Sequence, residues 1–288
     1  MHNSAIMTSR VRIAFAAGAA LLSVFALACD QPKPKCTSAH GRFAATFTLV
    51  SGDGACAELS SGVLNVQSYN DSTSKSDPRL DPNKPTLAIQ AEDVTDILST
   101  GRETDGKPFA FGAFDDSEPD GEGFCTVSSL SKAVLTAAAT DEVPEMMIDE
   151  CTTEPAMPAQ TAIDVSYKWS NVRIVVTPAA IGTKLEADLQ YTVDGCSAKY
   201  KVAAVWPVVE CGSPVEGSDE PSDEPMDEPA ADDEDAGAEP SDAGCPEEVP
   251  EPPAPELEAD DEICETQGAI PDFPVRCDPS VLMCVLED

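Results

Sequence analysis

The sequence predicts a mainly β protein whose folded part is one antiparallel β-sandwich or up-and-down β-barrel. Apolar and polar residues alternate in several segments, as in strands with one face in a core and the other in water. Two of these segments are joined by Asp194-Gly195, a favoured hairpin turn. Ten cysteines from Cys36 onward are expected to stabilise the fold as disulfides. We expect this disulfide-linked β-domain over residues 36–211, and the elements are considered below in chain order.

The first 28 residues have the pattern of an export signal. Arg10 and Arg12 precede the apolar run Ile13–Leu27, and no Asp or Glu occurs before Asp30. The run is shorter than the roughly 20 apolar residues that a transmembrane helix needs. We therefore expect residues 1–28 to form a signal peptide.

The end of this segment, Phe25-Ala26-Leu27-Ala28-Cys29, resembles the lipobox of bacterial lipoproteins. The resemblance implies cleavage before Cys29 and lipid on its thiol, with residues 29–35 as a lipidated tether. It implies a bacterial cell-envelope protein anchored by lipid, at the periplasmic face or the cell surface. The alternative is an ordinary signal peptide cut at Ala28.

The cysteine count agrees with this resemblance. The chain has 11 cysteines, and removing Cys29 leaves an even number. An even set in an exported chain is what a disulfide framework requires. The ten remaining residues are Cys36, Cys56, Cys125, Cys151, Cys196, Cys211, Cys245, Cys264, Cys277 and Cys284.

The predicted strands of the β-domain follow from alternation and from β-branched or aromatic content. They cover residues 43–49, 63–69, 86–91, 109–114, 163–169, 172–177, 185–193 and 198–204. Residues 129–139 are predicted as one short helix or a weak strand, and residues 69–85 as a polar loop.

Closure of the sheet suggests a disulfide scheme. If the first strand lies antiparallel to the last, its start is beside the end of the last strand, and its end is beside the start. This arrangement predicts the pairs Cys36–Cys211 and Cys56–Cys196, and leaves Cys125–Cys151.

The composition changes after Cys211. Residues 213–262 contain 21 Asp or Glu and no Lys or Arg, together with many prolines. Repulsion between like charges and proline oppose collapse, so residues 212–262 are predicted to be a disordered acidic spacer. Residues 263–288 form a small segment that could be a two-disulfide knot of Cys245, Cys264, Cys277 and Cys284, with its connectivity open.

The net charge of −36 argues against nucleic acid as a partner, because phosphates repel an acidic chain. The same charge would be repelled by anionic headgroups, so anchoring to a membrane is expected to depend on the lipid. A protein or small-molecule ligand is compatible with the composition.

The sequence motifs for catalysis or metal binding are weak, and no cofactor is indicated. His40 is the only histidine after the signal and is interpreted as a surface turn residue. Ser72–Lys75 and Ser129–Lys132 match Ser-x-x-Lys, but no Lys-Thr-Gly follows. Asp116, Glu118 and Asp120 match the start of a calcium loop, although Val127 stands where a bidentate Glu is needed. The preferred interpretation is an acidic turn, and zinc has no support.

The sequence therefore favours a non-enzymatic envelope lipoprotein that binds a ligand or partner, or has a surface or structural role. The alternative is an extracytoplasmic hydrolase with a carboxylate or calcium-assisted site. The interior of the β-domain discriminates between them. An apolar cavity would favour ligand binding, and two carboxylates facing across a cleft would favour hydrolysis.

Overall fold

The computed structural model describes residues 34–74, 77–147, 153–214, 256–267 and 273–287. The elements below belong to one compact unit that begins at Lys35. The predictions for the signal peptide, for Cys29, Cys151 and Cys245, and for most of the acidic spacer lie outside the described residues.

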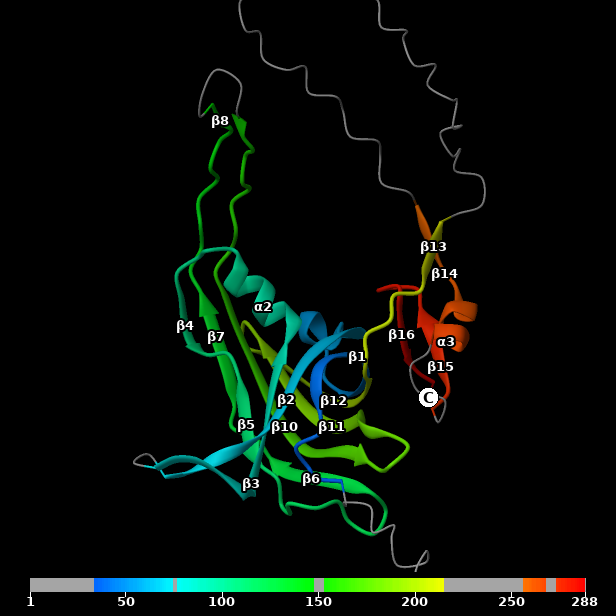
Figure 1. Ribbon diagram of the computed structural model, residues 1–288. Coiled ribbons are helices and arrows are strands. Elements are labelled where there is room, and N and C mark those ends of the chain that lie inside the picture. Colours follow the sequence, from blue (N-terminus) through cyan, green and yellow to red (C-terminus); the bar gives the residue numbers. More distant parts are fainter. Residues whose placement is uncertain (1–33, 75–76, 148–152, 215–255, 268–272, 288) are drawn as a thin grey trace, which may run out of the picture. The chain divides into compact units, whose positions relative to one another are not determined.

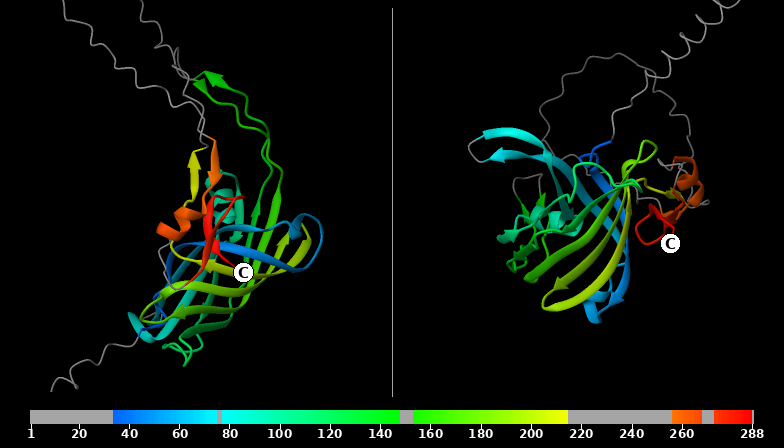
Figure 2. Two further views of the ribbon diagram at one scale, coloured as in Figure 1. Left: turned by 90° about the vertical axis from the view of Figure 1, so that its right-hand side faces the viewer. Right: turned by 90° about the horizontal axis from the view of Figure 1, so that it is seen from below.

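Ten strands form one antiparallel sheet that curls into a nearly closed barrel (Figures 1 and 2). They are β1 (His40–Ser51), β2 (Ser61–Ser74), β3 (Asp77–Ala91), β4 (Thr104–Lys107), β5 (Ala110–Ala113), β6 (Phe124–Ser129), β7 (Ala133–Ala137), β10 (Ile163–Val176), β11 (Ile181–Val193) and β12 (Cys196–Val205).

The first strand of the sheet pairs with the last in the middle of the strand order, and the two margins of the sheet meet on the other side of the barrel. β1 lies antiparallel between β12 and β2, so Ala44 is opposite both Val205 and Val63. Between the two margins of the sheet, Ser131 N donates to Phe111 O (2.7 Å) and Asp115 N donates to Thr126 O (2.9 Å). These bonds link the β5 region to the β6 region. The mainly β prediction is confirmed, and the structure is a barrel rather than a sandwich.

The inner face of the barrel is a packed apolar core. Trp169 and Tyr200 are 1% exposed, and Phe43, Leu64 and Leu185 are fully buried. In β12 the buried residues alternate with exposed lysines, as the sequence predicts. Burial of large side chains contributes about 1.5–3 kcal/mol each, so this core is the main source of stability.

One end of the barrel is covered by the segment that precedes β1. Cys36 and Ala39 are buried there, and Cys36 N donates to Ser117 O at 3.3 Å. Gly182, at a φ of 71°, allows this crossing, because a Cβ there would lie 2.7 Å from the backbone carbonyl of Ser38. The crossing brings Cys36 to Cys125, with a Cα–Cα distance of 5.5 Å.

The opposite end is covered in part by a 3₁₀ turn, η1 (Gly54–Ala57), and by helix α2 (Glu92–Ser99). The pairing of β1 with β12 places the predicted partners Cys56 and Cys196 together, with Cα atoms 5.6 Å apart. The Cys56–Cys196 prediction is therefore confirmed.

The C-terminal elements form a small subdomain beside β1 and β12. They are β13 (Gly212–Pro214), β14 (Leu257–Ala259), α3 (Asp261–Gln267), β15 (Val275–Asp278) and β16 (Met283–Leu286). Val285 and Leu286 pack against Ala44 and Val205 on the outer face of the barrel. The disulfides Cys211–Cys277 and Cys264–Cys284 hold this subdomain.

Two predicted disulfides are wrong. Cys36–Cys211 fails because the chain before β1 crosses the barrel end to Cys125, whereas Cys211 lies beyond the barrel and bonds Cys277. Cys125–Cys151 fails because Cys125 is already paired with Cys36. Cys277 was predicted to pair within the C-terminal group of four cysteines, but its partner, Cys211, is not one of them. Strand alternation predicts which strands pair, but not how the chain turns before and after them.

Several element predictions also need correction. The predicted strands 163–169 and 172–177 are one strand, β10, with an irregularity near Asn171, whose φ is 50°. For residues 129–139, the strand alternative is confirmed by β7, and the helix alternative is wrong. Much of the predicted polar loop 69–85 belongs to β2 and β3, which pair there. Described side chains in that hairpin are mostly exposed or half-buried, so they carry no alternating pattern.

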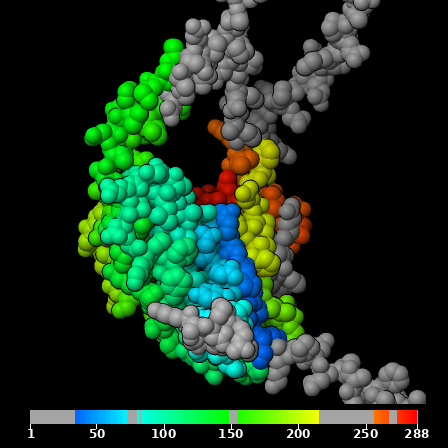
Figure 3. Space-filling view, turned by 60° about the vertical axis from the view of Figure 1, so that its left-hand side comes forward, coloured from blue at the N-terminus to red at the C-terminus, as the bar shows by residue number. Residues whose placement is uncertain are grey.

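Between β7 and β10 the chain forms an extended arm. Thr140 pairs with Gln160 and Val143 with Met157, and the arm leads to the short pair β8 (Met146–Met147) and β9 (Thr153–Glu154). The arm, in green, stands away from the barrel in Figures 1 and 3. No such arm was predicted from the sequence.

We predict that replacing both Cys36 and Cys125 with serine lowers the free energy of unfolding by about 2–5 kcal/mol, because the crossing segment is no longer linked to β6. Urea unfolding of the oxidised full chain measures this loss. Peptide mapping without reduction provides the control and should yield a Cys36–Cys125 peptide. A Cys36–Cys211 peptide would contradict the structure.

Candidate functional site

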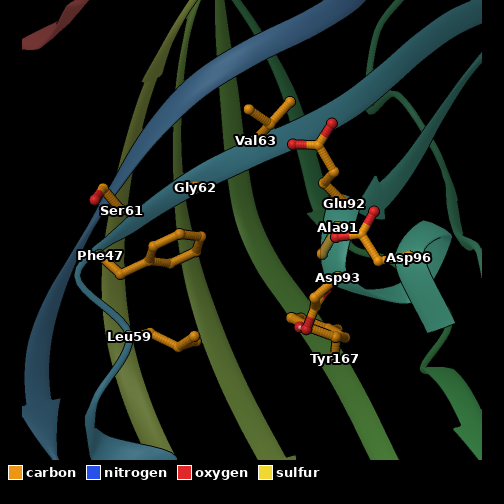
Figure 4. Close-up of a pocket in the computed structure, with 10 residues that line it drawn as sticks. All are labelled: Phe47, Leu59, Ser61, Gly62, Val63, Ala91, Glu92, Asp93, Asp96 and Tyr167. Carbon is orange, nitrogen blue, oxygen red and sulfur yellow. The ribbon is translucent and has the colours of Figure 1, made fainter. Parts of the chain in front are cut away.

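A pocket of about 230 Å³ opens at the end of the barrel that carries α2. Its walls come from the end of β1, the start of β2, and the junction of β3 with α2 (Figure 4). The lining residues are Phe47, Leu59, Ser61, Gly62, Val63, Ala91, Glu92, Asp93, Asp96 and Tyr167.

One wall of the pocket is apolar and fixed. The Phe47 ring lies edge-on to Tyr200, with ring centroids 6.2 Å apart. The Tyr200 hydroxyl accepts a hydrogen bond from Leu59 N (3.3 Å) and donates one to Cys56 O (2.6 Å). Because Cys56 is bonded to Cys196, this wall is tied to the start of β12.

The opposite wall is acidic and comes from α2. Buried Val94 anchors the first turn of this helix in the core, which leaves Glu92, Asp93 and Asp96 at the pocket. Glu92 forms an ion pair with Arg42 at 2.6 Å. Among the described residues, neither Asp93 nor Asp96 forms an ion pair.

The base of the acidic wall is a hydrogen bond from the Tyr167 hydroxyl to Asp93 Oδ2. Figure 4 shows the two side chains close together at the α2 side of the pocket, which both of them line. The Tyr167 ring packs against Tyr191 and Trp169, whose ring centroids are 5.1 and 6.3 Å away. The tyrosine ring is therefore a fixed donor for the carboxylate.

Burial changes the acid–base properties of this group. It raises the pKa of Asp93, and the Tyr167 hydrogen bond only partly opposes the rise. Burial and the Asp93 charge hold the pKa of Tyr167 well above its usual value and raise the pKa of Tyr191 to about 12. Both tyrosines are therefore neutral donors at any physiological pH.

The predicted calcium residues are used differently by the structure. Asp120 Oδ1 accepts backbone hydrogen bonds from Glu122 and Phe124, both at 2.9 Å, and the bond from Phe124 is the main cause of its lowered pKa. Glu118 forms an ion pair with Lys35 at 2.5 Å. Of the described residues, the one group of three potential metal donors is Cys211, Cys264 and Cys277, and all three are in disulfides.

The other sequence candidates lie apart from the pocket. His40 is exposed, and its Nδ1 lies 2.8 Å from Gln67 Nε2. Ser129 ends strand β6 and Lys132 is exposed after it, so this Ser-x-x-Lys match is not on a helix. Lys75 of the second match lies outside the described residues.

Asp93 and Tyr167 were not predicted as site residues from the sequence. Asp93 occurs in a helix of eight residues, which is too short for a clear periodic pattern. In the sequence, Tyr167 has the pattern of an ordinary core residue in a strand where apolar and polar residues alternate. Only the packing of β10 under α2 brings the two side chains together.

The fold and pocket define a disulfide-linked antiparallel β-barrel protein with a pocket at its mouth, between an apolar wall and an acidic wall. Residues 41–207, from the start of β1 to just after β12, match the MlpA protein family, and the chain belongs to that family. The match confirms the predicted class, a bacterial lipoprotein of the cell envelope. The family match does not include the C-terminal subdomain.

A protein of Myxococcus xanthus named "Putative lipoprotein MlpA" is 30% identical over 96 residues, which are 33% of this chain. The aligned part spans about a third (34%) of the length of that relative. No solved structure matches the chain. In the described part of the chain, no helix has the length and apolar character needed to cross a membrane.

We predict that the free energy of unfolding of the Asp93→Asn variant increases, relative to that of the wild type, as the pH rises from 3 to 7. Because the folded-state pKa of Asp93 is raised, its stabilising contribution is complete below the unfolded pKa of about 3.9 and is lost as the pH rises through the folded pKa. The asparagine variant has no such loss. Urea unfolding at several pH values measures the difference.

Asp188→Asn is the matched control with the opposite sign. Hydrogen bonds from Lys201 and Asn171 lower the pKa of Asp188, so its contribution is present above the unfolded pKa and is lost as the pH falls through the folded value. The Asp188→Asn variant should lose stability at pH 7 and approach wild type in acid. The same pH trend in both variants would contradict this assignment.

Proposed function

We propose that this protein is a lipid-anchored, non-enzymatic envelope protein that binds a small ligand in the pocket at the barrel mouth. The observation that carries the proposal is the pocket itself, which lies between the apolar Phe47–Leu59 wall and the acidic face of α2. Concave sites with apolar walls and a few convergent polar groups are the usual form of small-molecule sites.

The arrangement of the acids favours binding over hydrolysis. A carboxylate-based hydrolase needs two carboxyl groups on opposite sides of the reacting bond. Here Glu92, Asp93 and Asp96 all come from α2, and the facing wall is Phe47 and Leu59. The same wall therefore supplies every charge of the pocket, which suits a ligand held at one polar end.

The proposed anchor is the lipid on Cys29. The apolar run before Cys29 and membership in the MlpA family support it. A net charge of −36 offers little attraction to anionic headgroups, so several acyl chains would have to supply the membrane affinity. The barrel would then stand at the periplasmic face or the cell surface on the short tether 29–35.

We predict that at least one of three small phenyl compounds, namely phenethylammonium, 2-phenylethanol and phenylacetate, binds in the pocket. Gly62→Leu should abolish this binding, because Gly62 faces the pocket and a Cβ there would lie 3.7 Å from the Phe47 ring, an ordinary contact beyond which leucine fills the space. Saturation-transfer NMR on the full chain measures binding.

Gly121→Leu is the control for this experiment, since Gly121 is exposed and a Cβ at that position would have no atom within 4 Å. It should bind as wild type does. If none of the three compounds binds wild type, or if Gly62→Leu binds as well as wild type, the proposed pocket function is wrong.

We also predict that Cys29→Ala moves the protein from the membrane fraction to the soluble fraction, because the lipid attachment thiol is lost. Fractionation of cells that express the full chain measures this shift. Mass spectrometry of the wild-type N-terminus checks for acyl chains on Cys29. A wild-type N-terminus with an unmodified Cys29 thiol would refute the anchor.

A further inference from the structure

The pocket has an electrostatic property that limits which ligands it can hold. Three carboxyl groups line it, and none of its ten lining residues is Lys, Arg or His. Arg42 neutralises Glu92, but Asp93 and Asp96 have no ion-pair partner among the described residues. The pocket therefore has an excess of negative charge beside an apolar wall.

Asp93 is the main group in this excess of negative charge. Its carboxylate is half-buried at the base of the pocket, and the side chain that contacts it is the neutral donor Tyr167. A buried carboxylate without a counterion loses much of its hydration, and a cation placed beside it restores the lost stabilisation. Anionic ligands would be repelled by the same group.

The facing wall suits the other half of an organic cation. Phe47 presents an aromatic ring, which can bind an alkyl or aromatic substituent or attract a cation through its π face. Leu59 adds apolar surface beside it, as Figure 4 shows. A ligand that crosses this pocket meets apolar atoms at one end and carboxylates at the other.

The size of the pocket restricts the ligand further. Its volume of about 230 Å³ lies below the roughly 300–1,000 Å³ of sites for drug-sized ligands. It suits one ring or a short alkyl chain with a charged head.

We propose that the pocket at the barrel mouth binds small organic ammonium ions, with the ammonium group beside Asp93 and Asp96 and the apolar substituent against Phe47 and Leu59. This inference rests on the proposed ligand-binding function. It specifies the ligand as a primary ammonium ion with one apolar substituent of about the size of a phenyl ring.

Three compounds of similar shape and different charge test the proposal on the full chain. Isothermal titration calorimetry compares phenethylammonium, 2-phenylethanol and phenylacetate at pH 7. Because a hydrogen bond to a charged group contributes about 1.5–3 kcal/mol, the ammonium compound should bind at least about tenfold more tightly than the alcohol. Phenylacetate should bind more weakly than either.

Variants of the acids locate the effect. Asp93→Asn should remove most of the preference for the ammonium compound over the alcohol, and Asp96→Asn should reduce it. Asp188→Asn removes an acid outside the pocket and should leave the preference unchanged. Thermal unfolding confirms that each variant is folded. Asp96→Asn keeps the test valid if Asp93→Asn is unstable, because Asp96 is exposed.

The outcomes separate this proposal from the pocket function. Equal or tighter binding of 2-phenylethanol or phenylacetate, abolished by Gly62→Leu, would overturn the ammonium proposal and leave the pocket function standing. A preference for phenethylammonium that survives Asp93→Asn and Asp96→Asn would also overturn it. Failure of all three compounds to bind would overturn both.

Discussion

The pairing of β1 with β12 is the constraint on which the rest of the structure depends. It joins the first and last strands of the sheet, so β2, β3 and β5 follow on one side of the pair and β11, β10, β7 and β4 follow on the other. Its register places Cys56 beside Cys196 and the Phe47 ring against Tyr200, which fixes the apolar wall of the pocket. On the outer face, the same register makes Ala44 and Val205 neighbours, and the C-terminal subdomain packs on them.

The disulfides link to this sheet those segments that bury too little apolar surface to be held in place by packing alone. Cys36–Cys125 fastens the segment that crosses one barrel end, and Cys56–Cys196 fastens the turn at the other. The C-terminal subdomain has a small core, in which Cys264, Cys277 and Cys284 are among the buried residues. Such short elements bury too little apolar area to fold alone, and covalent links compensate. This use of cysteine agrees with an exported protein in an oxidising compartment.

The pocket is the place where the apolar filling of the barrel is interrupted. Elsewhere the inner face is filled by large side chains such as Trp169 and Leu185, whereas at the mouth a carboxylate is kept without a cation. Folding alone would favour an apolar residue or a paired charge at position 93, since burial disfavours the ionised carboxyl. A ligand with a positive charge would offset this desolvation cost when it binds, and the gain would contribute to its affinity. Residues that are unfavourable for folding often have functional roles, and this pattern supports a binding role for the mouth.

The sequence alone predicted the β class and the Asp194-Gly195 hairpin, because alternation reports which face of a strand is buried and a hairpin turn is local. The antiparallel pairing of the first and last strands was a hypothesis, and it led to the correct prediction of Cys56–Cys196. The tertiary structure alone decided the crossing of Cys36 to Cys125, the docking of the C-terminal subdomain, and the contact of Tyr167 with Asp93. Each of these depends on how non-strand segments turn over the barrel, and their short, mixed sequences carry no periodicity that could reveal the turn. The resemblance at Cys29 indicated the class of protein, and the packing of α2 over β10 produced its pocket.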